Sequence, residues 1–417
     1  MVFKNISDKK LPDDVNKFGI FANDELCLDE INVYGFDYDY TLAAYKKATV
    51  EQMLHSLAKK ALVTDLQYPE EMAQFEYDPN LTIRGLHYDI KNGLLLKVNS
   101  VLQVQSDAVF RGRKRLSEEE VNRIYPAKRL TLDQLEPRNP AKMKFVHLVD
   151  NFAKPVMCLL CDVIQWFVEN NIDYEPESIY MDVRVRIIIA RFLNHFLPFI
   201  LFQACIDKAH PLFHLAAASD PKIILEKDPG LQLMLERLKD QGKTTFLMTN
   251  SPFDIVNAGM NYMFDENWRS LFDIVIVNAK KPSFFTAAGR HFRVYSPKTG
   301  RLKWQKVATF REQRIYSGGN YENLVQMTGW EPNSVLYFGD HPYADLADLS
   351  MVHGWRTCAI IEDLEEEIDK LNDPQMKMKT NWTNVLQGLL DNYQDSLHDE
   401  ASRKLWYEWK SELDQYR

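Results

Sequence analysis

Four short apolar runs stand out along the chain, because each is rich in β-branched or aromatic residues and has the length of a strand. They cover residues 31–36, 244–249, 272–277 and 335–338. Longer stretches with helical spacing lie between several of them, for example residues 228–240. This alternation predicts an α/β fold in which helices cover both faces of a doubly wound parallel sheet.

Residues 155–167 have the continuous apolar character of a buried helix. Cys158 and Cys161 lie within this stretch, and no Cys/His pair follows at the spacing of a zinc finger. We therefore favour a core helix over metal or redox use of the two thiols. Further along, charge and proline indicate loops near residues 111–144 and 207–228, and helices are expected from Asn372 onward.

Residues 187–206 are about as long and apolar as a membrane span. Arg191 and His195 would be costly at the centre of a bilayer, and Pro198 would interrupt a helix. We therefore expect one or two buried helices broken near Pro198 and no membrane association. A membrane-associated protein anchored by this segment is the alternative.

Composition narrows the class of protein. The 417 residues include 50 Lys and Arg against 59 Asp and Glu, which gives a net charge of −9. Because the chain is acidic and has no long run of Lys and Arg, we expect no nucleic-acid partner, although a local basic pocket for one phosphate remains open. Five cysteines and an acidic first thirty residues favour the cytoplasm over a mitochondrial or membrane-associated location. Assembly into a homo-oligomer stays open.

Polar side chains follow each of the four predicted strands. They are Asp37 and Asp39, then Thr249 and Asn250, then Lys281, and finally Asp340 and Asp345. The carboxyl ends of parallel strands meet at one edge of a sheet, where ligands bind, so these clusters should converge. Each cluster alone is more often a turn, a cap or a solvated lysine. Their joint occurrence at four strand ends favours a functional site.

The converging groups have the chemistry of phosphoryl transfer through a covalent aspartyl intermediate. Asp37 can attack phosphorus, Asp39 can protonate the leaving alkoxide, and Lys281 can neutralise the developing charge. Asp340 and Asp345 offer the hard oxygen ligands that Mg²⁺ prefers. The sequence therefore predicts Mg²⁺ as the cofactor and a small phosphorylated molecule as the substrate.

The strand-end motifs carry a family resemblance. Residues 34–42, 77–89, 246–251, 272–285 and 337–346 resemble the ordered motifs of the haloacid dehalogenase-like superfamily. Within it, they are most similar to the cytosolic purine 5′-nucleotidase-like branch, which includes the 5′-nucleotidase domain-containing proteins. The resemblance implies a Mg²⁺-dependent phosphomonoesterase, a 5′-nucleotidase that hydrolyses nucleoside 5′-monophosphates. The alternative is a nucleotidase-like binding or regulatory protein that is catalytically weak or silent.

The same resemblance implies a role for each site residue. Asp37 is the nucleophile and a metal ligand, while Asp39 is the general acid and base and a ligand through its carbonyl. Thr249 and Asn250 hold the phosphate, and Lys281 bridges nucleophile and phosphate. The two remaining carboxylates bind the metal, with Asp340 as its anchor and Asp345 behind it, orienting Lys281 or a metal-bound water.

The long interval between the first two motifs predicts the domain organisation. Some 210 residues lie between Asp39 and Thr249, enough for a large cap inserted after the first motif. We expect a haloacid dehalogenase-like catalytic core at residues 1–50 and 225–371 and an inserted cap at residues 51–224. A C-terminal helical segment at residues 372–417 completes the prediction.

Overall fold

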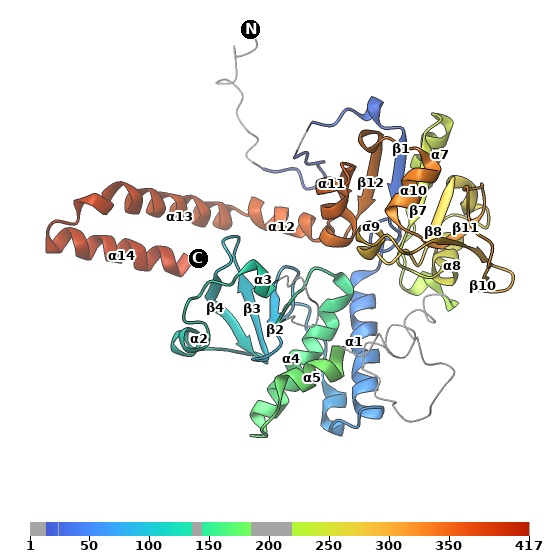
Figure 1. Cartoon of the computed structure of the whole chain (residues 1–417). Helices are drawn as coiled ribbons and strands as arrows, with labels where there is room; N and C mark the ends of the chain where they lie inside the picture. Colours follow the sequence, from blue (N-terminus) through green and yellow to red (C-terminus); the bar gives the residue numbers. More distant parts are fainter. Residues whose placement is uncertain (1–13, 24, 136–143, 185–218, 417) are drawn as a thin grey trace, which may run out of the picture. The chain divides into compact units, whose positions relative to one another are not determined.

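The computed structural model describes residues 14–23, 25–135, 144–184 and 219–416 (Figure 1). It divides into two compact units, one formed by Met1–Leu28 with Ile361–Arg417 and one by Asp29–Ile360. The segment 187–206 lies outside the described residues, so its predicted burial is still a prediction. The boundary between core and cap also stays a prediction, because the residues on both sides of it fall within the larger unit.

An eight-stranded sheet forms the centre of the larger unit, and its six strands from β11 to β13 are parallel. The strands are, in spatial order, β10 (Arg301–Leu302), β9 (Phe292–Ser296), β11 (Ile315–Gly318), β8 (Ile274–Val277), β7 (Thr244–Met248), β1 (Val33–Phe36), β12 (Val335–Gly339) and β13 (Arg356–Ala359). The four predicted strands are β1, β7, β8 and β12, and the prediction of a largely parallel sheet is confirmed.

Helices cover both faces of this sheet. Successive side chains of a strand point to opposite faces, so one strand contributes to a hydrophobic cluster on each side. The helices are α7 (Pro229–Asp240), α8 (Phe253–Met263), α9 (Ser283–Thr286), α10 (Tyr321–Thr328) and α11 (Asp348–Met351). Phe36 and Leu247 pack with residues of α7 and α8. Val33 and Phe246 belong to the opposite cluster, with residues of α9, α10 and α11. The α/β prediction is confirmed in this arrangement.

Residues between β1 and β7 contain a second, five-stranded antiparallel sheet, which the sequence patterns did not predict. Its strands are, in spatial order, β5 (Lys114–Arg115), β4 (Val104–Arg111), β3 (Leu94–Val98), β2 (His87–Asp89) and β6 (Phe145–His147). The helices of this region are α1 (Lys47–Thr64), α2 (Glu118–Ile124), α3 (Leu132–Leu135), α4 (Lys154–Glu169) and α5 (Pro176–Arg184). One face of the sheet packs on α1, α4 and α5, and α2 packs on the other.

Two predictions for this region have opposite outcomes. The expected core helix is α4, in which both Cys158 and Cys161 are buried. The expected loop at 111–144 is wrong in part, because α2 begins there at an N-cap in which Ser117 accepts a hydrogen bond from the Glu120 amide. This is the spacing of a capping box, a helix start that outweighs the local density of charge.

Among the described residues, one helical stretch, Asn151–Glu169, is long and apolar enough to cross a membrane. Within its apolar window, 72% of the residues are buried inside the protein. A core helix has the same property, so this stretch is weak evidence for a membrane span.

The smaller unit consists mainly of C-terminal helices, as expected from Asn372 onward. They are α12 (Asp363–Asn372), α13 (Pro374–Tyr393) and α14 (Glu400–Tyr416). Leu386, Leu390 and Leu413 form a small buried cluster between α13 and α14. Within this unit, the Val15 amide donates to Asn372 Oδ1 at 2.9 Å, which joins the N-terminal residues to the end of α12.

Candidate active site

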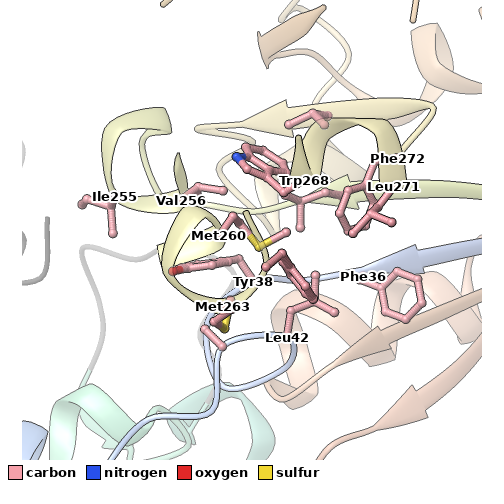
Figure 2. Packing of buried hydrophobic residues seen from close by; sticks show 14 of the residues in the cluster. Phe36, Tyr38, Leu42, Ile255, Val256, Met260, Met263, Trp268, Leu271 and Phe272 are labelled. Atoms are coloured by element: carbon pink, nitrogen blue, oxygen red, sulfur yellow. The ribbon is translucent and has the colours of Figure 1, made fainter. Parts of the chain in front are cut away.

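The first motif follows β1 at the point where the order of the sheet reverses. β7 lies on one side of β1 and β12 on the other, and such a switch point opens a crevice at the carboxyl ends of the strands. The Asp37 amide donates to Phe338 O at 2.9 Å, which fixes its height beside β12. Tyr38 packs into the hydrophobic cluster against α8, as Figure 2 shows.

Three carboxylates converge at these strand ends. One oxygen from each of Asp37, Asp340 and Asp345 lies within 4.8 Å of the others, and all three residues are buried or largely buried. Lys281 Nζ lies 2.9 Å from Asp37 Oδ1 and 2.5 Å from Asp345 Oδ1. One ammonium against three carboxylates leaves an excess of negative charge. Burial first, and then repulsion from Asp37 and Asp345, raise the pKa of Asp340 to about 8.

That excess fits a divalent cation. Mg²⁺ prefers hard oxygen ligands such as carboxylates. The two negative charges that Lys281 leaves uncompensated match the double positive charge of this ion. Asp37, Asp340 and Asp345 are therefore a candidate metal-binding group. The raised pKa of Asp340 reports the cost of keeping the third carboxylate ionised without such a cation.

Lys281 is held at both its backbone and its ammonium. Asn250 Oδ1 accepts from the Lys281 amide at 2.6 Å, and Asn250 Nδ2 donates to the Lys281 carbonyl at 3.0 Å. Tyr337 Oη accepts from Nζ at 3.0 Å. Burial of the ammonium lowers the pKa of Lys281, but the negative charges of Asp345 and Asp37 have the larger effect. They hold this pKa well above its usual range. The side chain of Asn250 thus positions the lysine.

Asp39 lies in a different environment from Asp37. Tyr45 Oη donates to Asp39 Oδ1 at 2.7 Å, and Ser251 Oγ donates to Oδ2 at 2.6 Å. Burial and the charge of Asp37 nevertheless raise the pKa of Asp39 to about 6. A carboxyl group with this pKa can hold a proton near neutral pH and release it, as a general acid and base must.

Thr249 and Asp345 depend on close backbone packing. Thr249 is fully buried, and its Oγ1 accepts from the Ser251 amide at 3.1 Å.

Asp345 lies in a π-helical turn at Pro342–Ala347, where its Oδ2 accepts from the His341 amide at 3.2 Å. A Cβ atom on Gly339 would lie 2.4 Å from Asp345 Cβ. Glycine at the end of β12 therefore lets Asp345 reach Lys281.

Residues from the region between β1 and β7 also reach the crevice. Arg84 Nη2 donates to the backbone carbonyl of Asp340 at 3.2 Å. His147 Nδ1 lies 3.2 Å from Tyr343 Oη, and the His147 ring stacks on that of His87 with centroids 4.2 Å apart. These contacts join this region to the segment Asp340–Tyr343 that follows β12.

Sequence reasoning found the charged residues of the site and missed four of their supports. Ser251 lies inside a motif that was recognised, and Tyr337 lies inside a predicted strand, so position alone could have suggested both. Arg84 lies in a matched motif without an assigned role. Tyr45 has no local signal, because it reaches Asp39 through a turn that only the folded chain shows.

Comparison with known proteins identifies the family to which the chain belongs. Residues 20–416 match the model of the 5′ nucleotidase family. The chain belongs to this family. The predicted resemblance is therefore confirmed at the level of the 5′ nucleotidase family, and the match extends over nearly the whole chain.

Relatives within the 5′ nucleotidase family are similar along most of their length. The human 5′-nucleotidase domain-containing protein 2 is 36% identical over 406 residues, which cover 97% of this chain and 74% of that protein. For the rat protein of the same name, the identity is 36% over 97% of this chain and 69% of the relative. A 5′-nucleotidase domain-containing protein of Dictyostelium discoideum is 36% identical over 371 residues, 86% of this chain and 58% of that protein.

Proposed function

We propose that the protein is a Mg²⁺-dependent phosphomonoesterase that hydrolyses nucleoside 5′-monophosphates through an aspartyl-phosphate intermediate. Membership of the 5′ nucleotidase family supports the reaction class and a small nucleotide as substrate. The observation that carries the proposal is the contact of buried Lys281 with Asp37 beside two further carboxylates. Such a site presents a nucleophile, a counter-charge for phosphate and oxygen ligands for a cation.

In the first step, Asp37 attacks phosphorus, the P–O ester bond breaks, and Asp39 gives its proton to the leaving alkoxide. In the second step, Asp39 takes a proton from water, water oxygen bonds to phosphorus, and the Asp37–phosphorus bond breaks. Lys281 stabilises negative charge on the phosphoryl oxygens in both steps. A bound Mg²⁺, held by Asp37, Asp340 and the carbonyl of Asp39, would screen charge between nucleophile and phosphate.

Thr249 and Asn250 are proposed to hold the phosphate in different ways. The Asn250 side chain is engaged with the Lys281 peptide, so its contact with phosphate would come from the backbone N–H. Thr249 Oγ1 already accepts a hydrogen bond, and its hydroxyl proton can be donated to a phosphate oxygen. We also propose that the eight-stranded sheet is a haloacid dehalogenase-like core, with residues 51–224 as its cap.

Phosphate release from a substrate panel tests the proposed function. The panel holds purine and pyrimidine nucleoside 5′-monophosphates and sugar phosphates, each with Mg²⁺ and with a chelator. We expect nucleoside monophosphates to be hydrolysed preferentially, and only with Mg²⁺. A chain that binds nucleotides but releases no phosphate from any compound would support the binding or regulatory alternative instead.

Ser251→Ala should move the alkaline limb of the pH profile upward. Burial raises the pKa of Asp39 to about 6, and the hydrogen bond from Ser251 opposes this rise because it stabilises the carboxylate. Removing that hydrogen bond should therefore raise the pKa further. A hydrogen bond to a charged group contributes about 1.5–3 kcal/mol, and one pKa unit corresponds to about 1.4 kcal/mol. We therefore expect kcat/KM to fall at a pH about one unit higher than in wild type.

The control for this profile is Ser270→Ala, which changes an exposed serine in the turn Trp268–Leu271. It should leave the profile unchanged. An alkaline limb that stays in place or moves to lower pH in Ser251→Ala would contradict the role of Asp39 as the proton donor.

A further inference from the structure

A second cluster of potential ligands lies between α1 and α4, apart from the carboxylate site. Cys158 and Asp162 are one turn apart on α4, which places both on one side of that helix. His55 reaches them from α1, and one atom from each of the three side chains lies within 4.8 Å of the others. All three residues are buried.

The cluster contains coordinating capacity that the fold does not use. His55 is 1% exposed, and among the residues that the structure describes no group hydrogen-bonds to its Nε2. Arg113 Nε donates to Asp162 Oδ1 at 2.5 Å, while Asp162 Oδ2 lies 3.9 Å from Cys158 Sγ. Arg113 thus fixes one carboxylate oxygen and leaves the other facing the thiol. Metal-binding carboxylates are commonly oriented by such outer partners.

An open pocket of about 640 Å³ leads to Asp162. Its rim is acidic, because four carboxylates and one guanidinium line it, those of Glu76, Asp78, Asp162, Glu169 and Arg113. An acidic pocket concentrates cations from solution. Its lining does not include Asp37, Asp340 or Asp345, so the pocket is distinct from the candidate active site.

We propose that His55, Cys158 and Asp162 bind a Zn²⁺ ion, with Asp162 connecting the site to the acidic pocket. Imidazole, thiolate and one carboxylate are the ligand types of three-ligand zinc sites, and the soft sulfur selects against Mg²⁺. Ligand atoms around tetrahedral zinc lie roughly 3.5 Å apart, given zinc–ligand bonds of about 2.0–2.3 Å. The Cys158 Sγ to Asp162 Oδ2 distance of 3.9 Å is already close to this value, and no pair of the three ligand atoms is more than 4.8 Å apart.

The protonation states of the free ligands set how binding depends on pH. Burial lowers the pKa of His55 to about 4, so its ring is neutral and ready to coordinate. Burial raises the pKa of Cys158 to about 12, so the free thiol keeps its proton. Coordination replaces that proton, which passes to solvent, and affinity should rise with pH. Zinc with one thiolate and one carboxylate is neutral overall, and the charge of Arg113 is balanced by Asp78 at 3.1 Å.

The adjacent cysteine on the same helix offers a matched control. Cys161 packs in the hydrophobic cluster around α4, whereas Cys158 faces the Asp162 carboxylate. Both thiols are buried, so a general effect of losing a buried sulfur appears in both variants. Cys158→Ser loses the proposed zinc ligand and changes the thiol contacts with Asp78 O and Asp162 Oδ2, whereas Cys161→Ala loses only a buried sulfur.

Zn²⁺ affinity is measured by competition with a chromophoric chelator, with Mg²⁺ in large excess to occupy the carboxylate site. Co²⁺ serves as a spectroscopic probe, because only a thiolate ligand gives a sulfur-to-cobalt charge-transfer band. We expect one Zn²⁺ per chain and this band in wild type and in Cys161→Ala. Cys158→Ser should lose the band. Its affinity for Zn²⁺ should fall by more than about 100-fold, because loss of a residue that only orients a ligand typically costs about 10 to 100-fold.

His55→Gln provides a second variant that keeps a polar side chain of similar size. It should weaken Zn²⁺ binding comparably while keeping the thiolate band at high Co²⁺ concentration. Circular dichroism establishes that each variant is folded before titration. The proposal is overturned if wild type binds no Zn²⁺ under excess Mg²⁺, or if Cys158→Ser or His55→Gln binds it as tightly as Cys161→Ala. It does not depend on phosphatase activity.

Discussion

Asp37→Asn is expected to reduce turnover by at least about a thousandfold, which corresponds to about 4 kcal/mol of barrier. The amide cannot form the bond to phosphorus and is a poor ligand for Mg²⁺. The fold should survive, because Asn has the same shape and the backbone bond from residue 37 to Phe338 is unaffected. Initial rates under saturating nucleotide and Mg²⁺ measure the loss.

The matched control is Asp107→Asn, which removes one carboxylate from an exposed position on β4. It should keep wild-type activity. Removing the Asp37 charge also relieves repulsion within the cluster, so the melting temperature of Asp37→Asn in metal-free buffer should not fall far. Residual activity within about tenfold of wild type would exclude Asp37 as the nucleophile.

Asp340→Ala and Asp345→Ala should fail in different ways. We expect Asp340→Ala to raise the Mg²⁺ concentration needed for half-maximal activity by more than about a hundredfold, since an outer partner alone typically contributes 10 to 100-fold. Asp345 instead accepts from Lys281 Nζ and the His341 amide. Its loss should leave a measurable but impaired enzyme, because it orients Lys281. Magnesium titrations of activity separate the two variants.

Thermal unfolding gives an independent measure of the same difference. Asp345→Ala removes a partner from a fully buried ammonium and should lower the melting temperature. Asp340→Ala removes a repelled carboxylate and should not lower it in metal-free buffer. Asp348→Ala, which lies directly after the turn and three residues from Asp345, is the control for both measurements. A larger magnesium requirement in Asp345→Ala than in Asp340→Ala would reverse the two roles.

Four of the six parallel strands could be predicted because they are buried on both faces and read as continuous apolar runs. The strands β11 and β13 were not predicted, and β13 is a short RTCA segment that is only partly buried. The same logic located the charged residues, since parallel strands bring their carboxyl ends together. The second sheet escaped prediction because β2 and β6 are each three residues long and contain His87, Asp89 and His147. Neither alternation nor apolar character identifies a strand that short.

The supporting contacts of the site were beyond sequence patterns for a different reason. The Asn250 motif looked like a phosphate loop, yet its side chain is engaged with the peptide of Lys281. Which partner an amide selects depends on how two strand ends are spaced in the folded sheet. Residue type and order predict that groups converge, whereas their pairing depends on geometry that only the tertiary structure fixes.

The strand order predicts when the candidate active site forms during folding. Asp37 and Asp340 are separated by more than half the chain and become neighbours only when β1 pairs with β12. The antiparallel strands β2, β3 and β4 pair with neighbours in sequence, so they can associate early. We therefore expect the carboxylate cluster to form late in folding. In a refolding experiment, regained catalysis would report the closed central sheet and not the appearance of secondary structure.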